Sequence, residues 1–277
     1  MVDEMRNRKT LGPLGAELIA RLYDDNKPIF KIDDVQRILG KKPNEAADFL
    51  SELTRKKILA RLKAGKFLII PQELGSAERY IGNWYVAARE IANSPDYYVA
   101  FYSAMQFWGM LTQPLLKIYV ATPKRQIVPF GLRDRLIFIF IKEKFVWGVQ
   151  EQWVTQTERV RISNLEKTVL DALAHPEYCG GIIEAAKGIW LVRDKIDFQK
   201  LKDYVGRHEK IVVAKRLGYI LEILKIDQPE LSAFLRMYVK DRYDLFDPAF
   251  AANRIDKNAW RLIDNVGRKH LLNVIGH

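Results

Sequence analysis

Apolar residues recur every three or four positions in three successive stretches near the start of the chain, which predicts three short amphipathic helices. Asp33 and Gln36 form the pattern of a capping box at the start of the second helix, and Gly40 ends that helix. Pro43 suits the first turn of the third helix. The apolar positions are Leu14, Leu18, Ile19 and Leu22; Ile32, Val35, Ile38 and Leu39; and Ala46, Phe49, Leu50 and Leu53.

Two short apolar runs follow these helices, at residues 59–62 and 67–70, and the turn Lys63-Ala64-Gly65-Lys66 separates them. Such a pair predicts a β-hairpin. Three helices followed by a two-stranded wing is the order of a winged helix-turn-helix. We therefore predict a winged helix-turn-helix DNA-binding domain over residues 1–75, with duplex DNA as its partner.

The rest of the chain, residues 76–277, is predicted to form a second domain. Helical patterns at residues 81–93 and 103–111 precede a series of strand-like runs, and from Asn164 onward the pattern is almost wholly helical, including a helical tail over 226–277. The fold class is α+β: an N-terminal winged helix-turn-helix, then a mixed α/β C-terminal domain with a small sheet and a helical C-terminal half. The expected strands are 117–121, 135–141, 145–149 and 159–162.

Polar residues of the third predicted helix point away from its apolar stripe, where they can reach base edges in a major groove. Arg55 suits guanine, Asn44 suits adenine, and Asp48 can accept a hydrogen bond from cytosine although it also repels phosphate. A solvated face of a small domain that binds protein is the alternative, which Glu45 and Glu52 keep open. The residues predicted to read bases are Asn44, Asp48, Ser51 and Arg55, and those predicted to hold phosphates are Lys41, Lys42, Arg61, Lys63 and Lys66.

The charge of the chain agrees with a polyanionic partner. The formal net charge is +11, and residues 41–66 hold eight Lys and Arg against three acids. A second basic segment is predicted to gather charges near strand ends as a polyanion-binding surface, and ordinary solvated loop charges are the alternative. Its members are Lys117, Lys124, Arg125, Arg133, Arg135, Lys142 and Lys144.

Several function classes are disfavoured. Cys179 is the only cysteine, so there is no internal disulfide and no cysteine-based metal site. The longest apolar run has six residues and the first ten residues are polar, so we expect a cytoplasmic protein without a membrane partner. The chain lacks a phosphate-binding loop and a nucleophile elbow, and its four histidines are dispersed. We therefore predict no catalytic residues, no metal and no cofactor.

From Tyr102 onward the sequence resembles the AbiEi family, the antitoxin half of an abortive-infection toxin–antitoxin pair that serves in antiviral defence. The run Glu166-Lys167-Thr168-Val169-Leu170-Asp171, followed by Gly180-Gly181, is the most specific part of the resemblance. The other residues that carry it are Tyr102-Ser103-Ala104, Trp108 to Gln113, Val120 to Lys124, Phe145, Gly148, Ile162 to Leu165 and Arg216 to Tyr219, together with the N-terminal wing.

The resemblance implies a two-part protein. Its N-terminal domain would bind promoter inverted repeats and repress the operon, and its C-terminal domain would counter a nucleotidyltransferase-like, AbiEii-type toxin without a stable complex. Arg216, with Lys117, Lys124, Arg125, Arg133 and Arg135, is the candidate antitoxin surface, although ion pairing is the alternative role for Arg216.

The motif residues also have structural interpretations. Ser163-Asn164-Leu165-Glu166 is the pattern of a capping box, and Gly180-Gly181 is suited to a turn between two helices. Two other functions stay open beside the antitoxin. One is a winged-helix regulator whose C-terminal domain senses a ligand unrelated to toxins, and the other is a nucleic-acid-processing enzyme.

Overall fold

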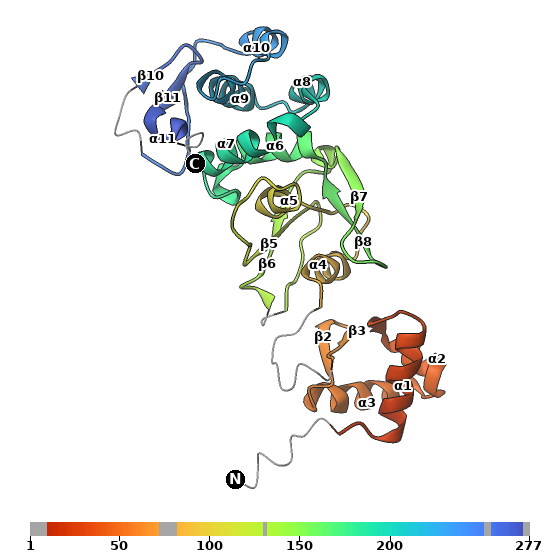
Figure 1. Cartoon of the computed structure of the whole chain (residues 1–277). Helices are drawn as coiled ribbons and strands as arrows, with labels where there is room; N and C mark the ends of the chain where they lie inside the picture. Colours follow the sequence, from red (N-terminus) through yellow and green to blue (C-terminus); the bar gives the residue numbers. More distant parts are fainter. Residues whose placement is uncertain (1–9, 72–81, 130–131, 252–255, 274–277) are drawn as a thin grey trace. The chain divides into compact units, whose positions relative to one another are not determined.

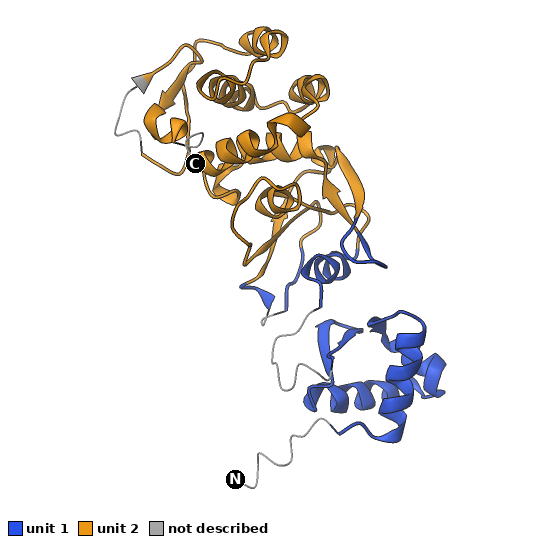
Figure 2. Cartoon of the chain, in the orientation of Figure 1, with its two compact units in different colours: residues 1–93, 126–134, 153–159 blue, residues 94–125, 135–152, 160–277 orange. Residues whose placement is uncertain are grey.

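The computed structural model describes residues 10–71, 82–129, 132–251 and 256–273 of the chain. The chain divides into two compact units, residues 1–93, 126–134 and 153–159 in the first and residues 94–125, 135–152 and 160–277 in the second (Figure 2). The predicted domain boundary between residues 75 and 76 lies outside the described residues. Helices and strands are segregated along much of the chain, so the fold class is α+β.

The first unit begins with a helix, a strand, two helices and a hairpin (Figure 1). The three strands form an antiparallel sheet in the order β1-β3-β2, in which Phe30 pairs with Phe67 and Arg61 also pairs with Phe67. The strand β1 was not predicted, because three residues carry too little periodicity. The elements are α1 (Pro13–Asp24), β1 (Ile29–Lys31), α2 (Ile32–Leu39), α3 (Pro43–Arg55), β2 (Leu59–Lys63), β3 (Lys66–Ile69) and α4 (Trp84–Ala92).

The start of α2 differs from the prediction that Asp33 caps it. The N-cap residue is Lys31, and the backbone amide of Lys31 donates to Oδ2 of Asp34 at 2.9 Å. Helix α2 begins two residues earlier than predicted because β1 runs directly into it. Asp34, the acid after Asp33, therefore accepts the backbone hydrogen bond at the start of the helix. Gly40 ends α2 in the left-handed conformation with φ +64°, as predicted.

The core of the first unit lies between its three N-terminal helices and the sheet. Leu18, Leu22, Val35, Leu50 and Leu53 are all at most 2% exposed. The prediction for Leu14 was wrong, because this side chain is 47% exposed on the outer face of the first turn of α1.

The second unit contains most of a five-stranded mixed sheet in the order β6-β5-β4-β8-β7. β5 runs parallel to β6 and antiparallel to β4, and β4 runs parallel to β8. The predicted strand at 145–149 was wrong, because residues 143–145 form a 3-10 turn and the strand starts at Val149. The strands are β4 (Tyr98–Val99), β5 (Ile118–Thr122), β6 (Leu136–Phe140), β7 (Val149–Trp153) and β8 (Arg159–Ser163).

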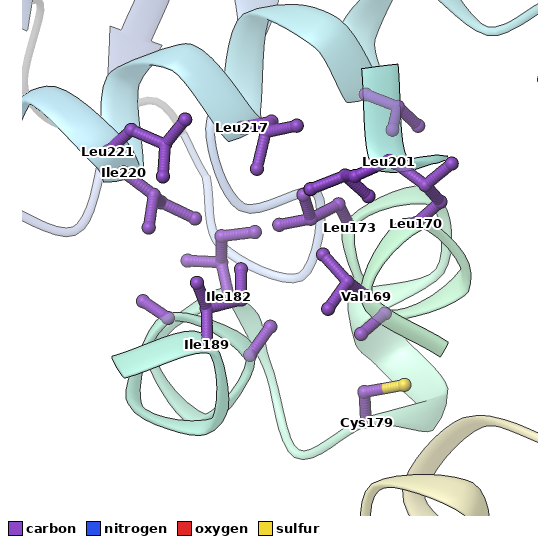
Figure 3. Close-up of a cluster of buried hydrophobic side chains, with 14 of the residues drawn as sticks. Val169, Leu170, Leu173, Cys179, Ile182, Ile189, Leu201, Leu217, Ile220 and Leu221 are labelled. Atoms are coloured by element: carbon purple, nitrogen blue, oxygen red, sulfur yellow. The ribbon is translucent and has the colours of Figure 1, made fainter. Parts of the chain in front are cut away.

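Helix α6 is the centre of the helical half, because it contacts α5, α7, α8 and α9. Figure 3 shows Val169, Leu170 and Leu173 of α6 directed toward apolar side chains of the neighbouring helices. These three side chains are fully buried. The helices are α5 (Phe101–Phe107), α6 (Leu165–Ala174), α7 (Ile182–Val192), α8 (Phe198–Arg207), α9 (Ile211–Ile223), α10 (Pro229–Arg236) and α11 (Arg268–Leu272).

The start of α6 corrects the predicted capping box. Asn164 is the N-cap residue, and its side chain accepts a hydrogen bond from the amide of Lys167 at 3.0 Å. Glu166 instead accepts from the amide of Asp197 at 3.2 Å and pairs with Lys200 at 2.8 Å. Glu166 therefore fixes the start of α8 against α6, a tertiary contact that the local sequence does not encode.

The tail is not wholly helical, contrary to the prediction for residues 226–277. It holds α10 and α11 and a small sheet of β9 (Asp244–Leu245), β10 (Asp256–Lys257) and β11 (Leu262–Asp264), in the order β10-β11-β9. Trp260 from this region is 1% exposed, and its indole packs directly over the backbone of Gly218 in α9. Gly180 and Gly181 have φ +76° and +93°, so the predicted glycine turn is confirmed.

None of the helices in the described ranges has the length and apolar character that crossing a bilayer requires.

Candidate nucleic-acid interface

Helix α3 has one buried face and one exposed face. Ala46, Leu50 and Leu53 are buried, whereas the four residues predicted to read bases are all exposed. Their spacing of four, three and four positions keeps them on one side of the helix. These exposed residues are Asn44, Asp48, Ser51 and Arg55.

Two of the three acids of α3 are held by groups beside them. Oε2 of Glu45 accepts a hydrogen bond from the backbone amide of Lys42 at 3.1 Å, which satisfies the start of the helix. Glu52 pairs with Lys56 at 2.6 Å across one turn. These contacts offset part of the negative charge of α3 that would otherwise oppose a phosphate backbone.

Basic residues surround the start of α3. Lys42 is exposed, and the ammonium of the half-exposed Lys41 lies 5.3 Å from the ring centroid of Phe49. The contact holds the Lys41 side chain along the surface of α3, and the helix amides at this end add a favourable potential for an anion.

The hairpin between β2 and β3 turns at Gly65, whose φ of +71° favours glycine. Lys63 and Lys66 occupy paired positions across this hairpin. Arg61 is exposed, and its Nε donates to the carbonyl of Lys63 at 3.4 Å. Partial burial, followed by the charge of Lys66, lowers the pKa of Lys63.

Lys66 does not lie with the phosphate-holding residues among which it was predicted. Its side chain is 11% exposed, and its ammonium lies 2.5 Å from Oε2 of Glu90 and 3.1 Å from Oδ1 of Asn93. The two lysines lie close enough to repel each other, and Glu90 of α4 compensates the charge of the buried one. Lys66 is thus a structural residue beside the turn of the hairpin.

The ion pair extends into a network within the first unit. Arg89 contacts Glu90 at 2.9 Å and Glu158 at 2.8 Å, and it also donates to the carbonyl of Arg159. Burial by itself raises the pKa of Glu90, but Lys66 and then Arg89 outweigh it and leave the pKa lowered. Sequence reasoning missed Glu90 because it lies 24 positions from its partner, where no local spacing signal exists.

The second basic segment does not form one surface. Lys117 and Arg135 lie just before two parallel strands, β5 and β6, whereas Lys124 and Lys142 lie just after them. The paired parts of these strands are five residues long, which separates the two ends by roughly 13 Å at the usual rise. Lys117, Lys124, Arg125 and Arg135 are exposed in the second unit, and Arg133 is exposed in the first.

Arg216 is buried and does not belong to an exposed antitoxin surface. It is 4% exposed, and its guanidinium donates to the carbonyls of Leu173 at 2.6 Å and Leu245 at 3.0 Å. Burial lowers its pKa against the opposing effect of nearby acids, Asp247 first. Arg216 therefore joins the end of α6 to β9, and within the described residues it forms no direct ion pair.

No family model and no curated protein matches the chain. The crystal structure of the RV2827C protein from Mycobacterium tuberculosis is similar, with a TM-score of 0.70 over 97% of this chain and 96% of that chain. The two sequences are 18% identical, and at this identity the likeness shows that the chain shares the fold of that protein.

Proposed function

We propose that the first unit is a winged helix-turn-helix that binds duplex DNA, and that the protein represses transcription. The observation that carries the proposal is the order helix, strand, helix, helix and hairpin, with β1 paired to the inner strand of the hairpin. Three residues join α2 to α3, the length of a helix-turn-helix connection. In this assignment α3 enters the major groove and the hairpin contacts the flanking phosphates.

The exposed chemistry supports the same assignment. Arg55 and Asn44 suit guanine and adenine on the outer face of α3. Around it Lys42 and Arg61 are exposed, and Lys41 and Lys63 are half-buried. Lys66 is removed from this set because it is paired with Glu90.

A gel-shift titration on the DNA upstream of the gene, with a scrambled duplex of equal length as control, tests repression. We expect binding to the upstream duplex that is tighter than to the scrambled duplex by a factor of about 1,000 or more at physiological salt. Equal affinity for both duplexes would contradict a sequence-specific repressor.

We further propose that the protein is the antitoxin of an AbiE-type pair. This part rests on the resemblance, which covers roughly residues 10–225, and on the +11 charge, which suits partners that handle nucleic acid. Co-expression of the full chain with a neighbouring nucleotidyltransferase-like toxin is expected to restore growth. The DNA-binding variant Arg55→Ala is expected to rescue equally well, and continued growth arrest with the unaltered chain would contradict the antitoxin role.

A regulator whose second unit senses a ligand is the alternative that one observation favours. A small cavity in the second unit is lined by Lys167, Asp171, His208 and Lys210. A sensor of this kind would release or bind the upstream duplex when its ligand is added, whereas the antitoxin assignment predicts rescue without any ligand.

A further inference from the structure

The most polar part of the interior of the second unit surrounds Asp171 in α6. Its carboxylate pairs with the ammonium of Lys167 one turn earlier and accepts a hydrogen bond from the hydroxyl of Tyr98 at 3.3 Å. Lys167 also donates to that hydroxyl at 3.3 Å, which closes a ring of three groups. All three residues are at most 4% exposed.

Burial of such a ring costs free energy, because an ion pair loses its hydration in the interior. A well-packed apolar trio would stabilise the fold at least as well. Lys167 and Asp171 belong to the run Glu166 to Asp171 that the sequence singled out. The DNA-binding assignment of the first unit makes no use of them.

A cavity of about 40 Å³ opens beside this ring. About 10–15 Å³ of such space holds one water, so the cavity accepts a few waters or a small oxyanion. The remaining lining residues are Tyr98, Phe101, Ile141, Phe145, His175, His208 and Lys210.

His208 lines the cavity, and one nitrogen of its buried ring lacks a partner. The residue is 4% exposed, and within the described part of the chain its Nδ1 makes no hydrogen bond. Its Nε2 lies 3.9 Å from Oδ1 of Asp171, which is too long for a hydrogen bond. Because Nδ1 has almost no surface accessible to a water molecule, His208 forms part of the cavity wall and its Nδ1 does not face the space.

Lys210 supplies a hydrogen-bond donor at the cavity. Its ammonium contacts Nε2 of His175 at 2.7 Å, and Nδ1 of His175 contacts Glu177 at 2.9 Å. Since Lys210 donates to Nε2, the proton of a neutral His175 is on Nδ1 and points to Glu177. The bond to His175 takes one of the three ammonium protons of Lys210, and the chain to Glu177 fixes the position of the group.

The charges around the cavity favour an anion. Of the charged lining residues, Lys167 and Asp171 neutralise each other as a pair, which leaves the ammonium of Lys210 as the net charge of the lining. Lys142 and Lys144 flank the lining residues Ile141 and Phe145, and Arg207 precedes His208. The acids of this rim are Glu143, which is exposed, Glu177, which contacts His175, and Glu209, which pairs with Lys144.

Backbone strain lies at the same place. Phe101, which lines the cavity, has φ +52°, a left-handed conformation that bulky residues seldom adopt. Its ring is held by His175 at 5.7 Å and Tyr178 at 5.2 Å between ring centroids. Such strain gathers at ligand-binding sites, where the surrounding structure holds a residue in an unfavourable state.

We propose that this cavity binds a phosphate group, with Lys210 as its donor, His208 in its wall and the Lys167–Asp171 pair as the element that shapes it. A phosphate can accept hydrogen bonds from several directions, and its charge suits the ammonium of Lys210. Free orthophosphate and the terminal phosphate of a nucleotide share this chemistry. The site is in the second unit and does not depend on the DNA-binding assignment.

Isothermal titration of the full-length protein with sodium phosphate, and separately with adenosine monophosphate, tests the site, with sodium chloride at equal ionic strength as the control. We expect saturable millimolar or tighter binding of phosphate, and a weakening of roughly tenfold or more for Lys210→Gln. Lys195→Gln, a change at an exposed lysine of the same unit, is the matched control and should leave binding unchanged. Tighter binding of the nucleotide identifies it as the source of the group, and equal binding identifies the free ion.

A second measurement covers the case in which Lys210→Gln does not fold. Nitrogen-15 NMR of the histidine rings in the unaltered protein should show a change at His208 on addition of phosphate and none on addition of chloride. Absence of saturable binding, equal losses in Lys210→Gln and Lys195→Gln, or an unchanged His208 ring would each overturn the proposal. Lys210→Gln should still shift the upstream duplex and Arg55→Ala should still bind phosphate, so failure of either proposal is recognised separately.

Discussion

The ammonium of Lys66 lies 2.5 Å from Oε2 of Glu90, so the first residue of β3 is bound to α4. Lys63 occupies the paired position on β2 and stays half-exposed. Two lysines that flank one turn therefore have different surroundings, and substitutions at them should have different effects.

For the exposed face of α3, we expect Arg55→Ala to lower affinity for the upstream duplex by about 1–3 kcal/mol, because a bidentate contact to guanine is lost. Binding to scrambled DNA should change far less. Gel-shift titrations on both duplexes measure the difference. An equal loss on both would assign Arg55 to phosphate contact, and no loss on either would remove it from the interface.

For the hairpin, we expect Lys63→Ala to weaken binding to every duplex and to reduce the slope of log affinity against log salt by about 1. The physical reason is that each phosphate contact releases a counterion from the DNA on binding, so the variant, which makes one contact fewer, releases one counterion fewer. Titrations at several salt concentrations measure the slope. Lys195→Ala is the control for the change in net charge, and an unaltered slope in Lys63→Ala would contradict phosphate contact by this residue.

For the Lys66–Glu90 pair, we expect Glu90→Gln to lower the free energy of unfolding by about 1–3 kcal/mol, because a largely buried ammonium loses its partner. Urea denaturation measures it, with Glu17→Gln at an exposed position as the control. A loss no greater than that of the control would contradict the structural role.

The same pair has a pH dependence of known sign. The pKa of Glu90 is lowered in the folded state. The ionised carboxylate therefore contributes fully to the free energy of unfolding above the ordinary pKa of 4.5, and this contribution is lost as the pH falls through the pKa of the folded state. Below pH 4.5 the unaltered protein should therefore lose stability more steeply than Glu90→Gln.

Protonation of His208 should lower the free energy of unfolding in a higher pH range than protonation of Glu90 does. Burial, against the opposing effect of Asp171, lowers its pKa to about 4. The unfolded state then binds the extra proton between pH 6.5 and 4, so up to about 3 kcal/mol of stability is lost as the pH falls through this window. Urea denaturation at pH 7.5 and pH 5 should show a smaller difference for His208→Asn than for the unaltered protein. His270→Asn, at an exposed helix position, is the control, and an unchanged difference in His208→Asn would be the contrary result.

Gly218 should tolerate no side chain. A Cβ atom there would lie 2.2 Å from the indole of Trp260, so we expect Gly218→Ala to destabilise the protein by about 3 kcal/mol or to prevent folding. Gly206 in α8 is the matched control, because a Cβ there would lie 3.7 Å from the hydroxyl of Tyr238. Gly206→Ala should be neutral or slightly stabilising. Thermal unfolding compares the two, and similar melting temperatures would contradict the packing.

Local patterns predicted the elements of the first unit well, because short helices and a hairpin are encoded by neighbours in sequence. The apolar stripe of α3, the end of α2 at Gly40 and the two hairpin strands are confirmed to within one residue. The roles of Lys66 and Arg216 were not predictable, since their partners Glu90 and Leu245 lie 24 and 29 positions away.

The candidate sites also divide into one that local sequence patterns predict and one that depends on residues far apart in the sequence. Exposure of the α3 residues follows from helical periodicity, which the sequence contains. The cavity beside Asp171 is assembled from β4, α6 and the segment after α8, and no spacing along the chain relates Tyr98 to His208. The tail was mistaken for helix because its strands are only two or three residues long.

Two cations of α9, Lys215 and Arg216, bind acceptors in the tail of the chain. Lys215 is 1% exposed and pairs with Asp244 at 2.8 Å, and Arg216 donates to the carbonyl of Leu245. A nascent chain that has emerged from the ribosome only as far as α10 would hold both charges in an apolar setting without these acceptors. The second unit therefore needs the segment that carries Asp244 and Leu245 before these two cations gain their acceptors, and a chain cut before residue 244 would lack both.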